Sequence, residues 1–488
     1  MPRSKRLTIG LAMIIGGKQF DAKVFQECLE SLRPIELDQI VVVDTGVGED
    51  AYGVIHCEDE YRASCHLAPI TQGKFAWCND FGAAREYSFS LLHEADIISW
   101  IDHDDTLQGA ELVRPYLASL GPEIGGVWCF YDYARDEYGN VHTTHVRERF
   151  LRPSIGWRWQ GRLHETAHPQ HSLDWATTED IRWVHRAKQP NQTARNLPIL
   201  LRWHEEEPDN FRVWLFIGNQ YFADAQWENA AKWYTKFWND SRGVLSDRLQ
   251  AMIYGANAWR GVFNVKEAIR ANMAGVTEFP SKADSYIGMC ENMILLRQWK
   301  KAIIWGEQVL QRDPVDPISF QNPLDYTWRI WKDLSIAYAG DGQLDKAVEA
   351  CDLALEVRPD DEDVLSNRDI FAKRLEKEKS LDGFVALRQN GSKPLRDLRL
   401  LRLLPRELRH EQKARDIWVP ALLTKAYRGT QPRIVFFCGP SLEDWNGDTP
   451  RTTGIGGSET AVVEVSRMLA KIGWKPLVYN SCGSGEGE

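Results

Sequence analysis

The sequence has no long hydrophobic run, no closely spaced cysteine pair and no excess of positive charge. Its 488 residues contain no run of about 18 apolar residues, the length that a membrane-spanning helix needs. Residues 1–7 are basic, but residues 8–15 have the pattern of a strand without a cleavage site behind it, so we expect no signal peptide. The nine cysteines show neither a Cys-X-X-Cys pair nor a zinc spacing. We therefore expect reduced thiols in a cytoplasmic protein.

The net charge of −10 disfavours broad, non-specific binding to nucleic acid, although a local basic groove is compatible with it. The 43% hydrophobic and 26% charged residues are typical of a folded globular protein. At this length we expect two to four domains.

One buried strand ends in a group of carboxylates. Ile97 to Ile101 form an apolar, β-branched and aromatic run, and Asp102, Asp104 and Asp105 follow it. Carboxylates this close repel one another unless a cation lies among them, and oxygen ligands suit Mg²⁺ or Mn²⁺. The first hypothesis is a divalent-metal site for a phosphate-bearing substrate. The alternative is an acidic turn that caps the next helix.

Strand and helix patterns alternate through the first 190 residues. This order predicts an α/β domain with a mainly parallel sheet, whose ligands bind at the carboxyl ends of the strands. Asp44 and Asp102 both stand at such ends. The predicted strands are residues 7–15, 40–43 and 97–101, and the predicted helices are residues 21–32 and 81–92.

A loop from Lys74 opens into the second of these helices. Asp80 is a candidate N-cap, and Arg85 is a candidate ligand for a phosphate or an acid. Plain capping with a surface arginine is the alternative.

Together these segments resemble, in order, the motifs of GT-A glycosyltransferases, and most closely family 2 enzymes that carry tetratricopeptide repeats. The resemblance covers about the first 200 residues, and its specificity lies in the ordered set. The motifs are Leu11–Ile14, Val41–Gly46, Phe75–Arg85, Trp100–Asp105, the tryptophan-rich Trp157–Glu165 and the closing strand Ile181–His185.

The resemblance implies a role for each matching residue. Asp44 binds the base or ribose, and Asp80 and Arg85 line the nucleotide pocket. Candidates for holding the phosphates of the nucleotide are Lys74, Arg147, Arg149 and Arg152. Asp102 and Asp104 hold Mn²⁺ or Mg²⁺ against the diphosphate of a nucleotide sugar, with Asp102 also in the nucleotide site. His185, or else His164, is the late metal ligand. The sequence departs from the family pattern after His185, where Arg186-Ala187 replaces X-Gly.

Family 2 enzymes usually invert the sugar, which requires a single general base on the face opposite the diphosphate. Glu165 and Asp105 are the candidates. Trp157 and Trp159 are candidates for stacking on a sugar ring, with core packing as the commoner fate of tryptophan.

From about residue 195 the pattern becomes purely helical and repeats internally. Four segments share a bulky apolar residue, two polar residues and an alanine, and in the last three a proline follows twelve residues after the alanine. The segments are Trp227–Ala230, Val265–Ala268, Trp299–Ala302 and Leu344–Ala347. The middle two lie 34 residues apart, the tetratricopeptide period, and an insertion around residues 318–326 lengthens the last spacing. We expect about four repeats that bind an acceptor or partner, or form a homodimer.

The C-terminal part starts another α/β pattern. Residues 401–430 read as a basic linker helix. A strand at Arg433–Gly439 is followed by a turn with Gly456-Gly457-Ser458-Glu459, a helix and a second strand at Leu477–Tyr479. This order resembles the first unit of a family 4, GT-B glycosyltransferase. Because this pattern stops after two strands, we expect a truncated start of such a domain.

We thus expect a GT-A domain at residues 1–192, a repeat domain at 193–400, the linker, and a GT-B-like piece at 431–488. The expected activity is metal-dependent, inverting transfer of a sugar, first of all from a UDP-hexose, to a protein, peptide or glycan. The rivals are a catalytically inactive tetratricopeptide scaffold and a sugar nucleotidyltransferase. Nucleotidyltransferases of this shape usually carry a glycine-rich loop after the first strand, and in this sequence only Gly16-Gly17-Lys18 matches such a loop.

Overall fold

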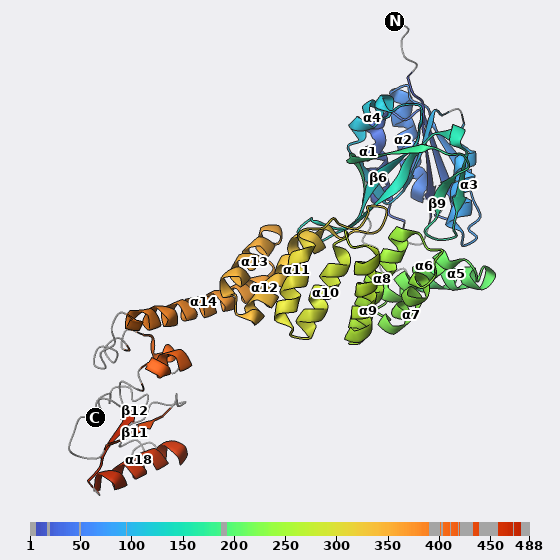
Figure 1. The fold of residues 1–488 in the computed structure, drawn as a ribbon. Helices are drawn as coiled ribbons and strands as arrows, with labels where there is room; N and C mark the ends of the chain where they lie inside the picture. Colours follow the sequence, from blue (N-terminus) through green and yellow to red (C-terminus); the bar gives the residue numbers. More distant parts are fainter. Residues whose placement is uncertain are drawn as a thin grey trace. The chain divides into compact units, whose positions relative to one another are not determined.

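The computed structural model describes residues 6–16, 20–47, 50–93, 95–186, 193–389, 401, 404–409, 411–417, 419, 433–438, 457–471 and 473–479 (Figure 1). The chain divides into two compact units, Met1–Leu365 and Ser366–Glu488. The proposed glycine-rich loop at Gly17-Lys18, the domain boundary at residue 192 and most of the linker lie outside the described residues.

The first part of unit one is a sheet domain. Its eight-stranded sheet has the order β3-β2-β1-β4-β7-β6-β10-β5, with β1, β2, β3 and β4 parallel to one another. A separate hairpin joins β8 and β9. The strands are β1 Ile9–Ile15, β2 Gln39–Asp44, β3 Ile70–Lys74, β4 Ile97–Asp102, β5 Asp105–Gln108, β6 Ile124–Arg135, β7 Val141–Leu151, β8 Trp157–Gln160, β9 Thr166–Pro169 and β10 Asp174–His185. The predicted α/β domain with a mainly parallel sheet is confirmed, although β7 and β5 run antiparallel to their neighbours.

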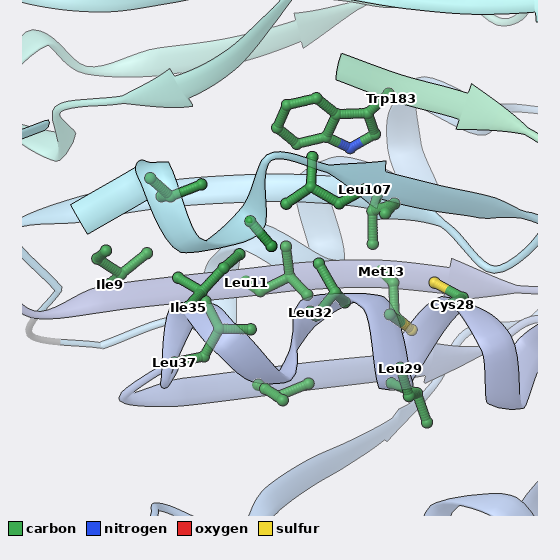
Figure 2. Packing of buried hydrophobic residues seen from close by; sticks show 14 of the residues in the cluster. Ile9, Leu11, Met13, Cys28, Leu29, Leu32, Ile35, Leu37, Leu107 and Trp183 are labelled. Atoms are coloured by element: carbon green, nitrogen blue, oxygen red, sulfur yellow. The ribbon is translucent and has the colours of Figure 1, made fainter. Parts of the chain in front are cut away.

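Helices cover both faces of this sheet because the β1 residues are apolar on both sides. Leu11 and Met13 pack against Cys28 and Leu32 of α1, as Figure 2 shows. On the other face, Ile14 packs with α3. The helices of the domain are α1 Ala22–Leu32, α2 Asp50–Ser64, α3 Phe81–Ser90 and α4 Val113–Ser119, with the short turns η1 Arg33–Ile35, η2 Ala110–Leu112 and η3 Pro153–Ile155.

The second part of unit one is an array of helices, each packed against the next. The helices are α5 Thr193–Glu206, α6 Phe211–Ala223, α7 Trp227–Trp238, α8 Leu245–Gly261, α9 Val265–Glu278, α10 Asp284–Leu295, α11 Trp299–Val309, the π-helical turn η4 Asp325–Arg329, α12 Ile330–Asp341 and α13 Leu344–Val357. α6 to α13 form four pairs, which confirms the predicted tetratricopeptide-like array.

The four pairs share one local geometry. In each, the short link between the two helices contains a residue with positive φ: Ala225, Phe263, Arg297 and Gly342. The alanine of each predicted segment is fully buried between helices: Ala230, Ala268, Ala302 and Ala347. Small side chains at these positions let neighbouring helices approach closely.

The second unit contains most of α14 Glu362–Gln389, the turn η5 Arg406–Leu408, β11 Arg433–Phe437, α18 Gly457–Lys471 and β12 Lys475–Tyr479. β11 and β12, which precede and follow α18 in the sequence, pair in parallel, as the predicted βαβ pattern requires. Residues 412–417 are helical within the predicted linker. Among the described residues, no helix is both long and apolar enough to cross a membrane.

Candidate functional site

The parallel strands bring several polar residues to one edge of the sheet. Asp102, the last residue of β4, pairs in register with Ile14, and Asp44, the last residue of β2, pairs with Ile15. On the far side of β2, Lys74 ends β3 opposite Asp44. The expected meeting of Asp44 and Asp102 at one edge is confirmed. β1 lies between β2 and β4, where the strand order reverses, and ligands bind at such switch points in open α/β sheets.

Three potential metal ligands converge beside this edge. Asp104 follows β4, Asp105 begins β5, and His185 ends β10 opposite Asp105 in the antiparallel ladder. One ligand atom from each lies within 4.8 Å of the others. Among the described residues, no other group of three or more histidine, cysteine, aspartate or glutamate side chains comes together in this way. The sequence brings the histidine here because the long strand β10 ends where β5 begins.

Asp105 orients the imidazole of His185. His185 Nδ1 lies 3.0 Å from Asp105 Oδ1, and the hydroxyl of Tyr131 donates to the same oxygen at 2.8 Å. A proton on Nδ1 facing the carboxylate leaves the lone pair on Nε2. Within the described part of the chain, His185 Nε2 and Asp105 Oδ2 are both buried without a hydrogen-bond partner. A carboxylate behind a histidine is the usual support of a metal-binding imidazole.

The site's electrostatics favour a cation. Burial raises the pKa of Asp105, although the hydrogen bond with His185 opposes the shift. Burial lowers the pKa of His185, but the hydrogen bond to Asp105 and the charge of Asp104 outweigh it and raise that pKa overall. These carboxylates therefore attract positive charge, from a proton on His185 or from a metal ion that displaces it. Two carboxylates and one imidazole fit Mn²⁺ or Mg²⁺.

Asp102 is engaged differently. The buried guanidinium of Arg85 donates to Asp102 Oδ1 at 2.5 Å and to Glu165 Oε1 at 2.6 Å. Its carbon lies 4.1 Å from the ring centre of Trp100. Burial opposes ionisation of Asp102, but Arg85, followed by Arg149, lowers its pKa to about 2. Arg85 thus ties the end of β4 to Glu165 of the predicted tryptophan-rich motif.

The compact cluster differs from the predicted ligand set in one residue. We expected Asp102, Asp104 and His185, whereas the structure groups Asp104 and His185 with Asp105. Asp102 forms an ion pair with Arg85 instead. The sequence could not separate these carboxylates, because the turn between β4 and β5 determines which of them points toward β10.

The other nucleotide-site candidates surround the edge. Asp44 accepts hydrogen bonds from the amides of Gly46 and Val47 at 2.7 and 2.8 Å and from Tyr52 at 3.1 Å. Burial opposes ionisation, yet these bonds lower the pKa of Asp44. Asp80 caps α3 by accepting from Ala83 at 2.9 Å, so its capping role is confirmed. Lys74 is exposed.

His164 lies apart from the acidic cluster. Its ring contacts Phe216 of α6 at a centroid distance of 4.7 Å, and burial, aided by Arg147 and Arg212, lowers its pKa to about 4. Of the two histidines considered, His185 is therefore the one beside the carboxylates. Trp157 and Trp159 are buried in the core, so the sugar-stacking alternative finds no exposed ring there.

Sequence reasoning missed two tyrosines that shape the site, and it considered Arg149 only as a ligand for phosphates. Tyr131 holds Asp105, and Tyr133 stacks on His185 with ring centres 5.1 Å apart. Arg149 is fully buried, and its Nη2 lies 3.8 Å from Asp105 Oδ2. Their alternation on β6 and β7 could have indicated one shared face, but only the pairing of these strands beside β4 and β10 shows which face it is.

No family model and no curated protein matches this chain. Solved structures that are similar to it include several tetratricopeptide-repeat proteins. MamA shares 21% identity over 34% of this chain and 87% of its own, with a TM-score of 0.28. A tetratricopeptide repeat protein from Parabacteroides merdae shares 12% identity over 49% of this chain and 88% of its own (TM-score 0.31), and TTC0263 from Thermus thermophilus shares 18% over 38% and 91% (TM-score 0.28). At this level of similarity no function transfers from them to this chain.

Proposed function

We propose that the chain is a metal-dependent glycosyltransferase that takes a sugar from a nucleotide diphosphate, with a UDP-hexose as the first candidate donor. The observation that carries the proposal is the convergence of Asp104, Asp105 and His185 at the carboxyl edge of the sheet. Two buried candidate ligand atoms there, His185 Nε2 and Asp105 Oδ2, accept no hydrogen bond from the described residues. Burying such groups unsatisfied is costly, and a bound cation removes the cost.

Asp104 and His185 would hold Mn²⁺ or Mg²⁺, with Asp105 either as a third ligand or as the group that orients His185. Bound there, the cation supplies positive charge to the departing diphosphate. Asp44 and Lys74 stand at the adjacent strand ends, where base, ribose and phosphate groups would lie. Arg85 keeps Asp102 ionised and holds it through one hydrogen bond, while a second hydrogen bond from the same guanidinium holds Glu165.

Two carboxylates, Asp105 and Glu165, are candidates for the general base. Asp105 has no exposed surface and already accepts from Tyr131 and approaches His185. Glu165 is 7% exposed and accepts from Arg85. We favour Glu165 as base, because Asp105 is fully buried and engaged by Tyr131 and His185. Glu165→Gln is then expected to reduce transfer while leaving metal binding intact, whereas Asp105→Asn should weaken metal binding.

The experiment measures binding and hydrolysis of a panel of nucleotide-sugar donors, with and without Mn²⁺, for the full chain and for Asp104→Ala. We expect metal-dependent release of nucleoside diphosphate from one donor and a loss of about 10² to 10³-fold in the variant. Asp174→Ala, an exposed carboxylate at the start of β10, is the matched control and should behave as the wild type. Absence of metal-dependent binding of any donor would contradict the proposal and favour the scaffold alternative.

The same assay separates the nucleotidyltransferase alternative, since that enzyme consumes a nucleoside triphosphate and a sugar phosphate and releases pyrophosphate. The helical array is proposed to bind the acceptor, a protein or peptide first and a glycan second. Its paired helices resemble scaffolds that present an extended surface to a partner.

A further inference from the structure

An insertion in the helical array lies against the sheet domain. Residues 310–324 connect α11 to η4, whereas residues 279–283 suffice to connect α9 to α10. Gln321 and Thr144 of β7 exchange backbone hydrogen bonds of 2.7 and 2.9 Å, and the amide of Val146 donates to Pro317 at 2.7 Å. The insertion therefore adds a short extended segment to the edge of β7.

This segment occupies the edge of β7 that β4 leaves open. β4 pairs with β7 only through Ile98 and Ser99, opposite Leu151 and Phe150. Continuing this antiparallel register places Asp102, where β4 ends, beside Arg147. Because the insertion bonds to the next residues of β7, it begins where β4 stops, at the edge that carries the candidate site.

A chain of contacts links the insertion to the acidic cluster. The ring of Phe320 lies 4.4 Å from that of His145, and His145 lies 5.4 Å from Tyr131. The hydroxyl of Tyr131 donates to Asp105 at 2.8 Å, and Asp105 faces His185. Burial lowers the pKa of His145 well below its usual value, so the imidazole is neutral. Its ring packs between those of Phe320 and Tyr131.

We propose that Phe320 is a positioning residue for the metal site, acting through His145 and Tyr131 on Asp105. The inference rests on the proposed function. It makes the helical array a part of the active site, because the array supplies the side chain that holds the ring of His145 in place. Neither the sheet domain nor the repeats by themselves would then have the site in its working geometry.

The test compares Mn²⁺ affinity of the full-length chain and three variants, measured from the electron paramagnetic resonance of free Mn²⁺. Phe320→Ala is expected to raise the dissociation constant about tenfold, the lower range for residues that support a metal ligand. Phe320→Tyr keeps the flat ring and should restore the affinity. Ile318→Ala, in the same insertion but 56% exposed, should leave it unchanged.

A fourth variant separates positioning from general loss of stability. Gly340→Ala crowds Trp299 within the array, away from the insertion, so it should leave Mn²⁺ affinity unchanged. If Phe320→Ala does not fold, Phe320→Leu takes its place with the same expectation, because leucine lacks the flat face.

Wild-type affinity in Phe320→Ala, together with loss of binding in Asp104→Ala, would overturn this inference and leave the proposed function standing. An equal loss in Gly340→Ala would overturn it as well. If the wild-type chain binds no Mn²⁺, the proposed function falls and the inference falls with it.

Discussion

At the residue scale, one buried arginine pairs with two carboxylates of the site, of which Glu165 is buried and Asp102 is partly exposed. Arg85 is 4% exposed and holds Asp102 and Glu165 through separate nitrogens. Its guanidinium also faces Trp100 and Trp159, which exclude water from these bonds. Arg85 therefore contributes to stability and to the site geometry together, since removing it leaves two carboxylates without their cation.

Arg85→Met tests this dual role. Leaving a buried carboxylate unpaired should lower the free energy of unfolding by about 3–5 kcal/mol, as measured by urea denaturation. Arg158→Met is the control, because Arg158 pairs with Glu86 at the surface and such a pair contributes about 1 kcal/mol or less. If the two substitutions lower the free energy of unfolding equally, the ion pairs of Arg85 with Asp102 and Glu165 do not stabilise the fold as proposed.

A second group of buried charges lies in the helical array. Asp333 of α12 has a buried oxygen with no hydrogen-bond partner in the described ranges. Burial, and next the charge of Glu291, raises the pKa of Asp333 to about 8. The folded chain thus keeps a proton that the unfolded chain releases near pH 4. Stability from this group is present below about pH 4 and is lost as the pH rises to about 8.

Asp333→Asn removes this dependence. The variant should match the wild type near pH 4 and exceed it near pH 8, with the melting temperature several degrees higher. Asp363→Asn is the control, because that side chain is 81% exposed. Thermal unfolding at the two pH values measures the effect. If Asp333→Asn is less stable than the wild type at pH 8, the raised pKa of Asp333 is contradicted.

At the scale of elements, the repeats are held together by contacts between tryptophan and glycine. Trp227 begins α7 and packs on Gly261 at the end of α8, and Trp299 begins α11 and packs on Gly340 near the end of α12. The same pairing in two repeats explains why a bulky residue begins these predicted segments. The close approach of each indole leaves no room for a Cβ atom on the facing helix, so the facing residue is glycine.

Gly261→Ala and Gly340→Ala should each destabilise the chain by about 1–3 kcal/mol, because the added methyl would lie 2.7 and 2.4 Å from the indole. Gly53→Ala in α2 meets nothing within 4 Å and should stabilise by about 0.5–1 kcal/mol. Denaturant unfolding gives all three values. Stability unchanged in both tryptophan-facing variants would show that the helices do not approach this closely.

Local patterns predicted much of the fold. Apolar runs gave β1, β2 and β4, and Asp80 was correctly predicted to cap α3. The repeats followed from the recurring alanine. The pairing of β10 with β5 was not predictable, because it joins residues about 80 positions apart. Without it, the choice of His185 and the placement of Asp105 beside it could not be made from spacing alone.

At the scale of the whole molecule, the sheet domain and the helical array share one compact unit. Arg358, which follows α13, binds Asp136 at the tip of the β6–β7 hairpin at 2.9 Å, and Asn140 donates to Val357. The insertion with Phe320 is a second contact between them. The array therefore holds the N-terminal half of β7, the strand that also carries Arg149 beside Asp105.

The central claim is that the ends of β4 and β10 form one divalent-metal site. The most direct measurement is a Mn²⁺ titration of the full chain followed by electron paramagnetic resonance, with Asp104→Ala and His185→Ala beside the wild type. We predict one tightly bound Mn²⁺ per chain, lost in both variants and tightened by added UDP. Absence of Mn²⁺ binding in the wild type, or binding that neither substitution weakens, would contradict the account.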